Sequence, residues 1–215
     1  MFREGPGPNG DNTRMDLLIG LFFIAMGVHA AKTAEQRNRI ALLGSHLQKF
    51  QLEKHMEQLI SGYLRALGEK DPERSEPIWR NLEGIEATVK EQLAQLARDL
   101  HEVWNERTRV SRWPLAVPFS TRLFPASTFD LRTLLEVHAK GFETALRNDD
   151  GLSRRDQAFR LTAELLLFQH SCHWFCRSKS VASARLLALH KTAYEQVVAA
   201  VSPQTRQAYL ALVRG

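Results

Sequence analysis

The chain contains 215 residues, of which 44% are hydrophobic and 25% charged, and its formal net charge is +5. This composition is close to the average of globular proteins and excludes a wholly disordered chain. Because the chain has two cysteines, a disulfide framework and a four-cysteine zinc ribbon are also excluded. The length predicts one domain of ordinary size, or one domain with an appendage.

The charge is distributed unevenly along the chain. Residues 1–108 contain 14 Lys and Arg against 16 Asp and Glu, a net charge of −2. Residues 109–215 contain 15 against 8, a net charge of +7, and the two halves sum to +5. A basic half suits nucleic acid, anionic lipid headgroups or an acidic partner. The alternative is a solvated surface that is rich in Arg.

The N-terminal region divides into a polar tail and an apolar segment. Residues 1–14 are rich in Gly, Pro and Asn, which predicts a disordered tail. Residues 15–31 are apolar on all sides, with an uninterrupted run from Leu17 to Val28. At 1.5 Å per residue this segment would reach about 25 Å, slightly less than the hydrocarbon core of a bilayer. We predict that residues 15–31 form a single-pass membrane-anchor helix.

Two other interpretations of this segment stay open. Val28-His29-Ala30 has small residues at the spacing that signal peptidase requires, so the segment could be cleaved near Ala30 and the body exported. The short length also permits a buried helix of a soluble bundle, because such a helix can be apolar all round.

The basic residues that flank the segment predict its orientation. Four lie on the C-terminal side against two on the N-terminal side: Lys32, Arg37, Arg39 and Lys49 against Arg3 and Arg14. This bias places the C-terminal body on the cytoplasmic side of an inner (plasma) membrane, and we expect a bacterial protein. Gly20, Gly27 and Ala31 form a small face that would let two anchor helices approach closely, which predicts a homo-oligomer.

The rest of the chain predicts helices, so the expected fold class is all-α. Apolar residues recur at intervals of three and four, and no interval of two persists. The anchor could continue as one helix to Gly68, with Gly44 as its weak point, although the apolar stripe shifts in phase after Phe50. A second helix would begin after Asp71-Pro72 or Glu76-Pro77.

This second helix has a heptad-like apolar seam. Its members are Ile78, Leu82, Ile85, Val89, Leu93, Leu96, Leu100 and Val103. The seam predicts coiled-coil packing, within the chain or between chains. Two such helices joined by a short loop would fold back on each other, so residues 32–110 are expected to form a long helical hairpin.

Residues 111–128 form a Pro-rich apolar loop. Pro114, Pro118 and Pro125 forbid a continuous helix. A solvated linker would not carry as many apolar residues, so we expect an ordered loop that packs against the bundle. It separates the acidic half of the chain from the basic half.

Residues 129–215 predict a basic helical bundle. Its first helix would be capped by Ser127 or Thr128, and its central helix would run from Ser153 to about Arg177. Another helix would start at Ser180, with Leu187 buried and Val201 near its end. Ser202 and Pro203 would start a last short helix.

His170, Cys172, His173 and Cys176 are the residues that most resemble a metal site. On one helix, Cys172, His173 and Cys176 lie on neighbouring faces, and thiolate and imidazole suit zinc or copper. A fourth ligand would come from another helix, from His138 or His190. The alternative is that these residues are buried parts of the core. We predict no cofactor.

No catalytic motif is present in the sequence. A Glu-x-x-His pair, His-Glu-x-x-His, Cys-x-x-Cys-His and a phosphate-binding Gly-x-x-x-x-Gly-Lys loop are all missing. A Ser/His/Asp set is not tested by sequence, because its members meet only in space. We therefore expect no catalysis; the third hypothesis is a helical enzyme without a readable motif.

The basic residues of the second half suggest a surface for anions. They are Arg154, Arg155, Arg160, Arg177, Lys179, Arg185 and Lys191. Arg177 and Lys179 flank a predicted helix junction, where free backbone N–H groups attract anions. No nucleic-acid motif organises these charges, so nucleic acid is disfavoured as a partner, and anionic lipid headgroups fit equally well.

The leading hypothesis is a membrane-anchored helical adaptor or assembly subunit that acts through protein–protein contacts. It combines the anchor of residues 15–31 with the hairpin and the basic bundle. The interaction residues it names are Gly20, Gly27, Ala31, Arg177 and Lys179. The alternative is a soluble or exported bundle that binds a metal or a small ligand near His170, His173 and Cys176.

Overall fold

The computed structural model describes residues 9–215, with side chains from residue 13 onward, and its fold is all-α as predicted. Ten α-helices lie within these residues: α1 (Asn9–Leu47), α2 (Leu52–Gly68), α3 (Pro72–His101), α4 (Asn105–Thr108), α5 (Ser120–Leu123), α6 (Leu131–Arg147), α7 (Arg154–Cys176), α8 (Lys179–His190), α9 (Tyr194–Ala200) and α10 (Pro203–Arg214). Two short strands, β1 (Arg109–Ser111) and β2 (Thr128–Asp130), and the 3-10 turn Pro125–Ser127 complete the described fold.

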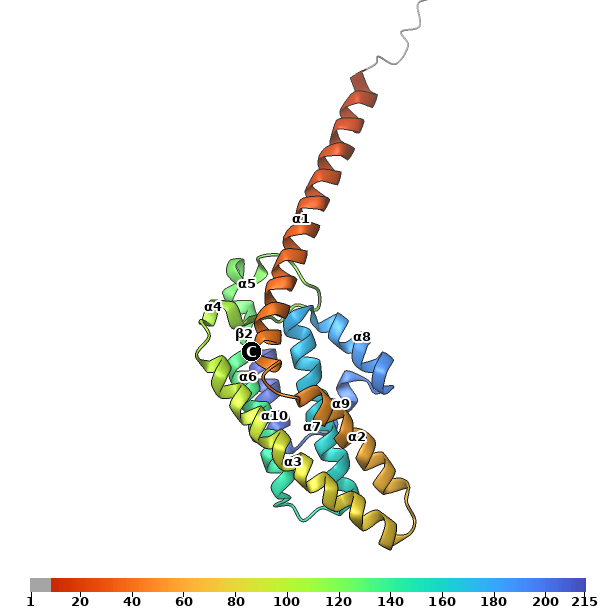
Figure 1. Ribbon diagram of the computed structural model, residues 1–215. Helices are drawn as coiled ribbons and strands as arrows, with labels where there is room; N and C mark the ends of the chain where they lie inside the picture. The colour runs from red at the N-terminus through yellow and green to blue at the C-terminus, as the bar shows by residue number, and fades with distance from the viewer. Residues whose placement is uncertain (1–8) are drawn as a thin grey trace, which may run out of the picture.

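The first half of α1 projects from the body as a bare helix (Figure 1). It contains an 18-residue window with a mean hydropathy of 1.7, and none of that window is buried. Among the described residues, this is the one helix long and apolar enough to cross a membrane. The alternative of a helix buried in the chain's own bundle is therefore wrong, because the body does not cover this segment.

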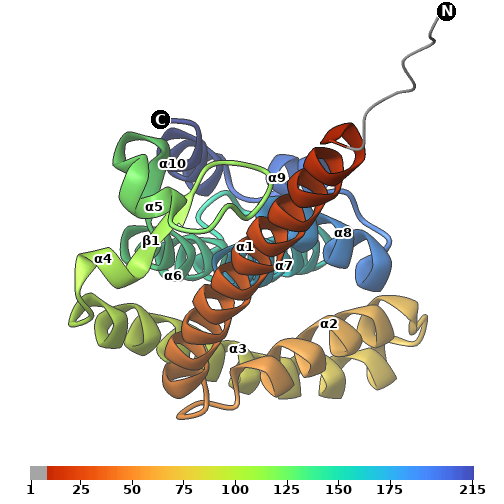
Figure 2. The same ribbon diagram turned by 90° about the horizontal axis from the view of Figure 1, so that it is seen from above.

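Helix α1 begins earlier than the sequence suggested. Residues 9–14 continue the helix, whereas we predicted a disordered tail as far as Arg14. Residues 1–8 of that tail lie outside the described residues. The helix runs without interruption through the predicted cleavage position at Ala30 and enters the body, where Leu42 and Leu43 are buried. Seen from above, α1 crosses over the body (Figure 2).

The prediction of one continuous helix to Gly68 is wrong. The helix ends at Leu47, and α2 begins at Leu52. The break coincides with the shift in phase of the apolar stripe: Leu43 and Leu52 can both be buried, at 2% exposure each, only because the chain changes direction between them. Gly44, which we expected to be the weak point, lies inside α1.

Helices α2 and α3 form a helical hairpin over residues 52–101, whereas residues 32–110 were expected to form it, and α3 packs against α2 on one side and α6 on the other. Asp71 caps α3 by accepting a hydrogen bond from the Glu73 amide at 3.0 Å, and Pro72 is its first residue. The seam is buried within the chain at Leu82, Val89, Leu93, Leu96 and Leu100, and partly buried at Ile78, Ile85 and Val103. The seam is therefore satisfied by intrachain packing.

Helix α7 is the centre of the bundle and contacts α6, α8, α9, α1 and α2. Its middle is buried on all sides, as its apolar sequence predicted. Ser153 accepts a hydrogen bond from the Asp156 amide at its start. Ser202 caps α10 in the same way through the Thr205 amide, and Pro203 follows it. These local start signals are therefore confirmed.

The predicted helix from Ser180 to Val201 is broken in two. Lys191 adopts a left-handed backbone conformation, with φ of 54°, and ends α8. Helix α9 starts afresh at Tyr194. Leu187, which we expected to be buried, is 53% exposed because α8 lies at the edge of the bundle.

A two-stranded antiparallel ladder closes the base of the Pro-rich loop, and no strand was predicted there. Ser111 pairs with Thr128 and Arg109 with Asp130. Since Thr128 lies in β2, the cap of α6 is Asp130, which accepts the Arg132 amide at 2.9 Å, and neither Ser127 nor Thr128 caps it. The loop is ordered as predicted, but several of its apolar side chains stay exposed.

The substitution Gly141→Ala in α6 is expected to lower the free energy of unfolding by about 1 kcal/mol. A Cβ atom at this position would overlap Thr205 Oγ1 and lie 2.7 Å from Glu164 Oε2. Overpacking costs about 1–3 kcal/mol, while Ala gains about 1 kcal/mol in helix propensity. The control is Gly84→Ala, where no atom lies within 4 Å of the new Cβ; it should stabilise. Urea denaturation measures both, and equal shifts would contradict the prediction.

Candidate functional site

Helix α1 is held to the body by a polar joint just beyond its apolar half. Arg39 Nη1 donates to the carbonyl of Phe175 at 3.2 Å, and its guanidinium lies 5.5 Å from the centre of the Phe175 ring. The same guanidinium pairs with Glu35 at 2.7 Å, and the other oxygen of Glu35 accepts the backbone N–H of Phe119 at 3.1 Å. Helix α1 is therefore fixed both to α7 and to the Pro-rich loop.

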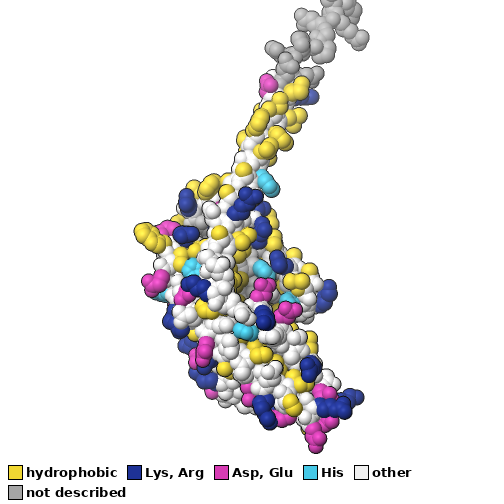
Figure 3. Space-filling model, in the orientation of Figure 1, with side chains coloured by type: hydrophobic (Ala, Val, Ile, Leu, Met, Phe, Trp, Pro, Cys, Tyr) yellow, Lys and Arg dark blue, Asp and Glu magenta, His cyan; other side chains and the backbone are white. Residues whose placement is uncertain are grey.

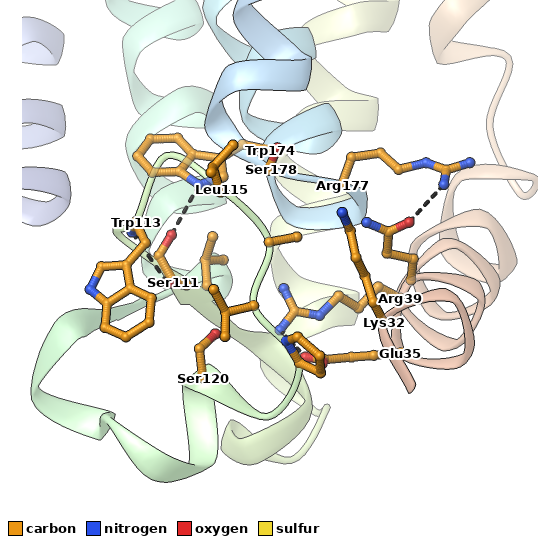
Figure 4. A pocket seen from close by; sticks show the side chains of 15 residues that line it. Lys32, Glu35, Arg39, Ser111, Trp113, Leu115, Ser120, Trp174, Arg177 and Ser178 are labelled. Carbon is orange, nitrogen blue, oxygen red and sulfur yellow. Dashed lines mark hydrogen bonds and ion pairs between the residues drawn. The ribbon is translucent and has the colours of Figure 1, made fainter. Parts of the chain in front are cut away.

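The close-up in Figure 4 shows Glu35 and Arg39 of this joint and the residues that line the space beside them. Arg177 Nη1 donates to Gln36 Oε1 at 2.8 Å, and Trp174 Nε1 donates to the carbonyl of Ser111 at 3.0 Å. The cavity between α1 and the loop is only about 30 Å³, which is too small for a drug-sized ligand. The polar contacts of this region position α1 against the body. The sequence analysis treated Arg39 only as a flanking charge and missed its structural contact.

An open apolar groove of about 540 Å³ lies between the C-terminal part of α1, α2, α7 and α8. Its apolar lining includes Ile40, Leu43, Gly44, Leu47, Leu52, Met56, Ile60, Leu64, Phe168 and Leu189. Its carboxylate and imidazole lining residues are Glu53, Glu57, His173 and His190. The groove arises because the break after Leu47 sets α1 and α2 apart from each other over α7. We call it the α1–α2 groove.

The predicted metal ligands Cys172, His173 and Cys176 line the α1–α2 groove. They are not arranged as a metal site: among the described residues, no group of three or more His, Cys, Asp or Glu side chains could hold an ion. Burial raises the pKa of the Cys176 thiol to about 11 and that of Cys172 further. In the metal-free protein both thiols are therefore protonated at neutral pH, and a metal would have to displace these protons to bind. The hypothesis of metal binding gains no support.

His170, the other member of that cluster, points into the core. Its ring stacks on Tyr194 with centroids 4.6 Å apart, and Nε2 lies 3.1 Å from Ser183 Oγ. Burial lowers the pKa of His170 to about 3, with the Lys179 ammonium as a second cause. It is a neutral core residue. His190, proposed as a fourth ligand, instead lies 3.0 Å from Gln169 Oε1.

His138, the other proposed fourth ligand, pairs with Ser171 at the α6–α7 contact. Their Nε2 and Oγ atoms are 2.8 Å apart. Because Ser171 donates to the Leu167 carbonyl at 2.9 Å, His138 Nε2 must carry the proton and donate to Ser171. His138 Nδ1 finds no partner among the described residues. No carboxylate of the described residues orients the ring, and both residues are 1% exposed, so the pair lacks the oriented base and the access that a catalytic nucleophile requires.

Glu164 is a buried carboxyl group that no pattern in the sequence indicated. It lies in the middle of α7 at 2% exposure, and its Oε1 accepts the backbone N–H of Ser202 at 3.0 Å. Burial raises the pKa of Glu164, and the hydrogen bond from Ser202 opposes this shift. Through Oε1 the carboxyl group holds the start of α10 against α7, while Oε2 is buried without a hydrogen-bond partner among the described residues.

The predicted anion site at the α7–α8 junction is largely occupied by the protein itself. The amide of Ser180 donates to the Pro114 carbonyl at 3.0 Å, and that of Val181 donates to Ser178 Oγ. The Lys179 ammonium lies 4.9 Å from the centre of the Tyr194 ring and 5.3 Å from that of Trp174. Arg177 and Lys179 therefore hold the body together, which weakens their assignment as an anion site.

The remaining basic residues of this half are partly paired. Arg154 forms an ion pair with Glu76 at 2.8 Å, and Arg160 pairs with Asp150. Arg155 lies over the Phe159 ring. These contacts give no continuous stripe of free cations of the kind that follows a nucleic-acid backbone.

Comparison with protein-family models, with curated proteins and with solved structures finds no match to this chain. The functional argument therefore depends on the geometry of α1, of the α1–α2 groove and of the Pro-rich loop.

The small-residue face of the anchor lies on the free part of α1. Gly20 and Gly27 have no atom of the body within 4 Å of a Cβ position. The close approach of a second helix would thus be unobstructed there, and self-association through Gly20, Gly27 and Ala31 stays a prediction.

Proposed function

We propose that this chain is a membrane-anchored adaptor: α1 crosses a bilayer once and holds the helical body at its cytoplasmic surface. The observation that carries the proposal is the bare apolar half of α1. Large side chains such as Leu18, Phe23 and Ile24 are 65–67% exposed there. In water this surface would be strongly unfavourable, at roughly 25 cal/mol per Å², whereas a bilayer would cover all sides of the helix.

The joint between α1 and the body favours an anchor over a signal peptide. The helix is continuous from Asn9 to Leu47, and Glu35, Gln36 and Arg39 bind the body immediately after the apolar part. Such contacts transmit the position of the membrane helix to the body. The basic residues that follow the apolar segment support the cytoplasmic orientation. Basic side chains gather where the helix meets the body (Figure 3).

The adaptor would bind an amphipathic helix of a partner protein in the α1–α2 groove. The lining residues of α2 run from Leu52 to Leu64, about 18 Å or three helical turns. A row of this length suits apolar anchors at i, i+3, i+4 and i+7 of a partner helix. Glu53 and Glu57 are exposed on α2 beside it, so the partner helix should carry Lys or Arg next to its apolar face.

Membrane fractionation tests the anchor. A C-terminal fusion of the full chain is expected to stay in membranes after a carbonate wash, and its N-terminus should precede residue 15. A version that lacks residues 1–30 is the control and should be released. Release of the full chain, or a mature chain beginning at Ala31, would overturn the anchor.

Photo-crosslinking tests the groove. Gly44 lines it, and no atom lies within 4 Å of its Cβ position, so a photoreactive side chain fits there without displacing the body. Gly84 on α3 is equally unobstructed and serves as the control. We expect adducts with a basic amphipathic protein segment at position 44 and none at 84. Lipid adducts at 44, or equal adducts at both positions, would contradict a helix-binding groove.

A further inference from the structure

The Pro-rich loop places an apolar surface beside the anchor. Residues 112–127, here called the apolar loop, carry five large side chains that are 42–67% exposed: Leu115, Val117, Phe119, Leu123 and Phe124. Single exposed apolar residues are ordinary on protein surfaces. Five within ten residues are a concentration of apolar surface that is typical of a contact with a protein or a membrane.

The base of the apolar loop is firmly held, so its exposed side chains do not result from poor packing. The β1–β2 ladder closes the loop. Arg112 donates from its backbone N–H to the Ser127 carbonyl at 2.9 Å, and from Nη2 to the Leu212 carbonyl at 3.1 Å. The Trp113 ring packs on Phe124 with centroids 5.0 Å apart. The fold thus presents the tip of the loop on a fixed base.

The apolar loop lies at the end of the body from which α1 projects. Helix α5, which is part of the loop, lies beside α1 at that end (Figure 1), and Lys32 and Glu35 of α1 line a cavity together with Leu115. The hydrogen bond from the Phe119 amide to Glu35 fixes this neighbourhood. Glu35 is four residues beyond Ala31, about 6 Å along the helix. The headgroup layer is about 5–7 Å thick, so a membrane that ends at Ala31 would place the loop at headgroup depth.

The backbone of Phe119 supports a functional role for this tip. Its φ of 59° lies in the left-handed region. This conformation is unfavourable by about 1–2 kcal/mol for a bulky residue, and Gly or Asn adopts it with less strain. The chain nevertheless has an aromatic side chain there, half exposed.

The charge around the apolar loop suits a lipid surface. The sequence between Arg107 and Phe129 contains no Asp or Glu. It contains three arginines, Arg109, Arg112 and Arg122. Arg122 is exposed on α5. Exposed apolar side chains with neighbouring cations are the combination that binds the headgroup and acyl boundary of an anionic leaflet. The Glu35 carboxylate beside Phe119 is paired with Arg39.

We infer that the apolar loop inserts into the interface of the same membrane that α1 enters, giving the body a second, peripheral contact with the bilayer. This inference rests on the proposed function, because it requires α1 to be in a membrane. The loop and the anchor together would determine which face of the body meets the lipid.

Fluorescence quenching by spin-labelled lipids tests the inference. The full chain, with Cys172 and Cys176 replaced by Ala, is reconstituted into phosphatidylcholine vesicles with a minor fraction of phosphatidylglycerol. A fluorophore is attached through Leu123→Cys. The matched control is Leu64→Cys on α2, where the native side chain is 65% exposed against 67% at Leu123. The C-terminal end of α2 lies far from the apolar half of α1 (Figure 1).

We expect shallow spin labels to quench the fluorophore at position 123 several-fold more than the one at 64. A third label, through Phe22→Cys in the bare part of α1, should be quenched by deep spin labels. Quenching at 22 with none at 123 would overturn the inference alone. No quenching at 22 would overturn the anchor and the inference together. A label at 123 that is unquenched in vesicles but shielded in concentrated detergent solution would assign the loop to contacts between copies of the chain and would overturn the lipid contact.

Discussion

Lowering the pH from 7 to 5 is expected to reduce the free energy of unfolding by about 4 kcal/mol through His138 and His170. Both are almost completely buried, and burial lowers the pKa of each to about 3. In the unfolded chain a histidine has a pKa of about 6.5. Below that value the unfolded state takes up protons that the folded state does not. Each residue thus contributes stability that is present above pH 6.5 and is lost as the pH falls toward 3, about 2 kcal/mol by pH 5.

The structure explains why neither ring accepts a second proton. His138 Nε2 already donates to Ser171, and Nδ1 is buried with no partner among the described residues. A proton on Nδ1 would be an unsatisfied buried donor on a charged ring, which is more costly than an unsatisfied lone pair. Nδ1 of His170 is in the same situation, and the Lys179 ammonium adds repulsion.

Glu164 acts in the opposite direction and must be separated from the histidines. Its pKa is raised by burial, so it contributes stability at low pH that is lost as the pH rises through its folded value. Glu164→Gln removes this contribution. In that background the loss between pH 7 and pH 5 should reflect the histidines more directly.

Urea denaturation of the full chain in a nonionic detergent, followed by circular dichroism, measures the effect at each pH. His138→Gln should remove about half of the pH dependence, since an amide can still donate to Ser171 but does not titrate. The control is His101→Gln, because the His101 side chain is 66% exposed and its contact with Glu136 at 3.8 Å is a surface pair of small energy; it should change the dependence much less than His138→Gln. If the unsubstituted chain, His138→Gln and His101→Gln lost the same stability between pH 7 and pH 5, the buried histidines would not be the cause of the pH dependence.

Leu96→Ala in the α3 seam is expected to lower the free energy of unfolding by about 3 kcal/mol, within the 2–5 kcal/mol range for buried leucines. Leu96 is fully buried, and α3 is packed between α2 and α6, so the neighbouring helices cannot easily collapse into the space left. The control Leu64→Ala removes a side chain that is 65% exposed and should change stability by less than about 0.5 kcal/mol.

This pair of variants also decides whether the seam is satisfied within the chain. Because the seam packs against α2 and α6 of the same chain, the loss at Leu96→Ala should not change over a tenfold range of protein concentration. A loss that appears only in dilute protein would mean that the seam is completed by a second copy.

Local signals predicted helix starts well, and contacts between distant residues explain the failures. Asp71-Pro72, Ser153 and Ser202-Pro203 carry their caps in the adjacent sequence, and the structure confirms all three. The left-handed conformation at Lys191, in contrast, could not be predicted, because the position carries neither Gly nor Asn. The β1–β2 ladder is too short to produce a visible alternation. Both depend on how the bundle closes.

The groove was the part of the candidate site that sequence analysis missed, although a signal was present. The apolar stripe changes phase after Phe50, and we interpreted this as one helix rather than as a break. The change of direction between Leu47 and Leu52 is what sets α1 and α2 apart and creates the groove. Arg39 could not have been assigned, because its partner Phe175 lies 136 residues away.

The rigid joint at Glu35 and Arg39 has a mechanical consequence for a chain anchored as proposed. With no linker between the apolar half of α1 and the body, the molecule behaves as a lever whose short arm lies in the lipid. Helix α3, with 30 residues, is about 45 Å long. A change of about 10° in the tilt of the anchor, as occurs between bilayers of different thickness, would swing a point that far from the fulcrum by about 8 Å. Bilayer thickness would thereby determine the position of a bound partner relative to the membrane.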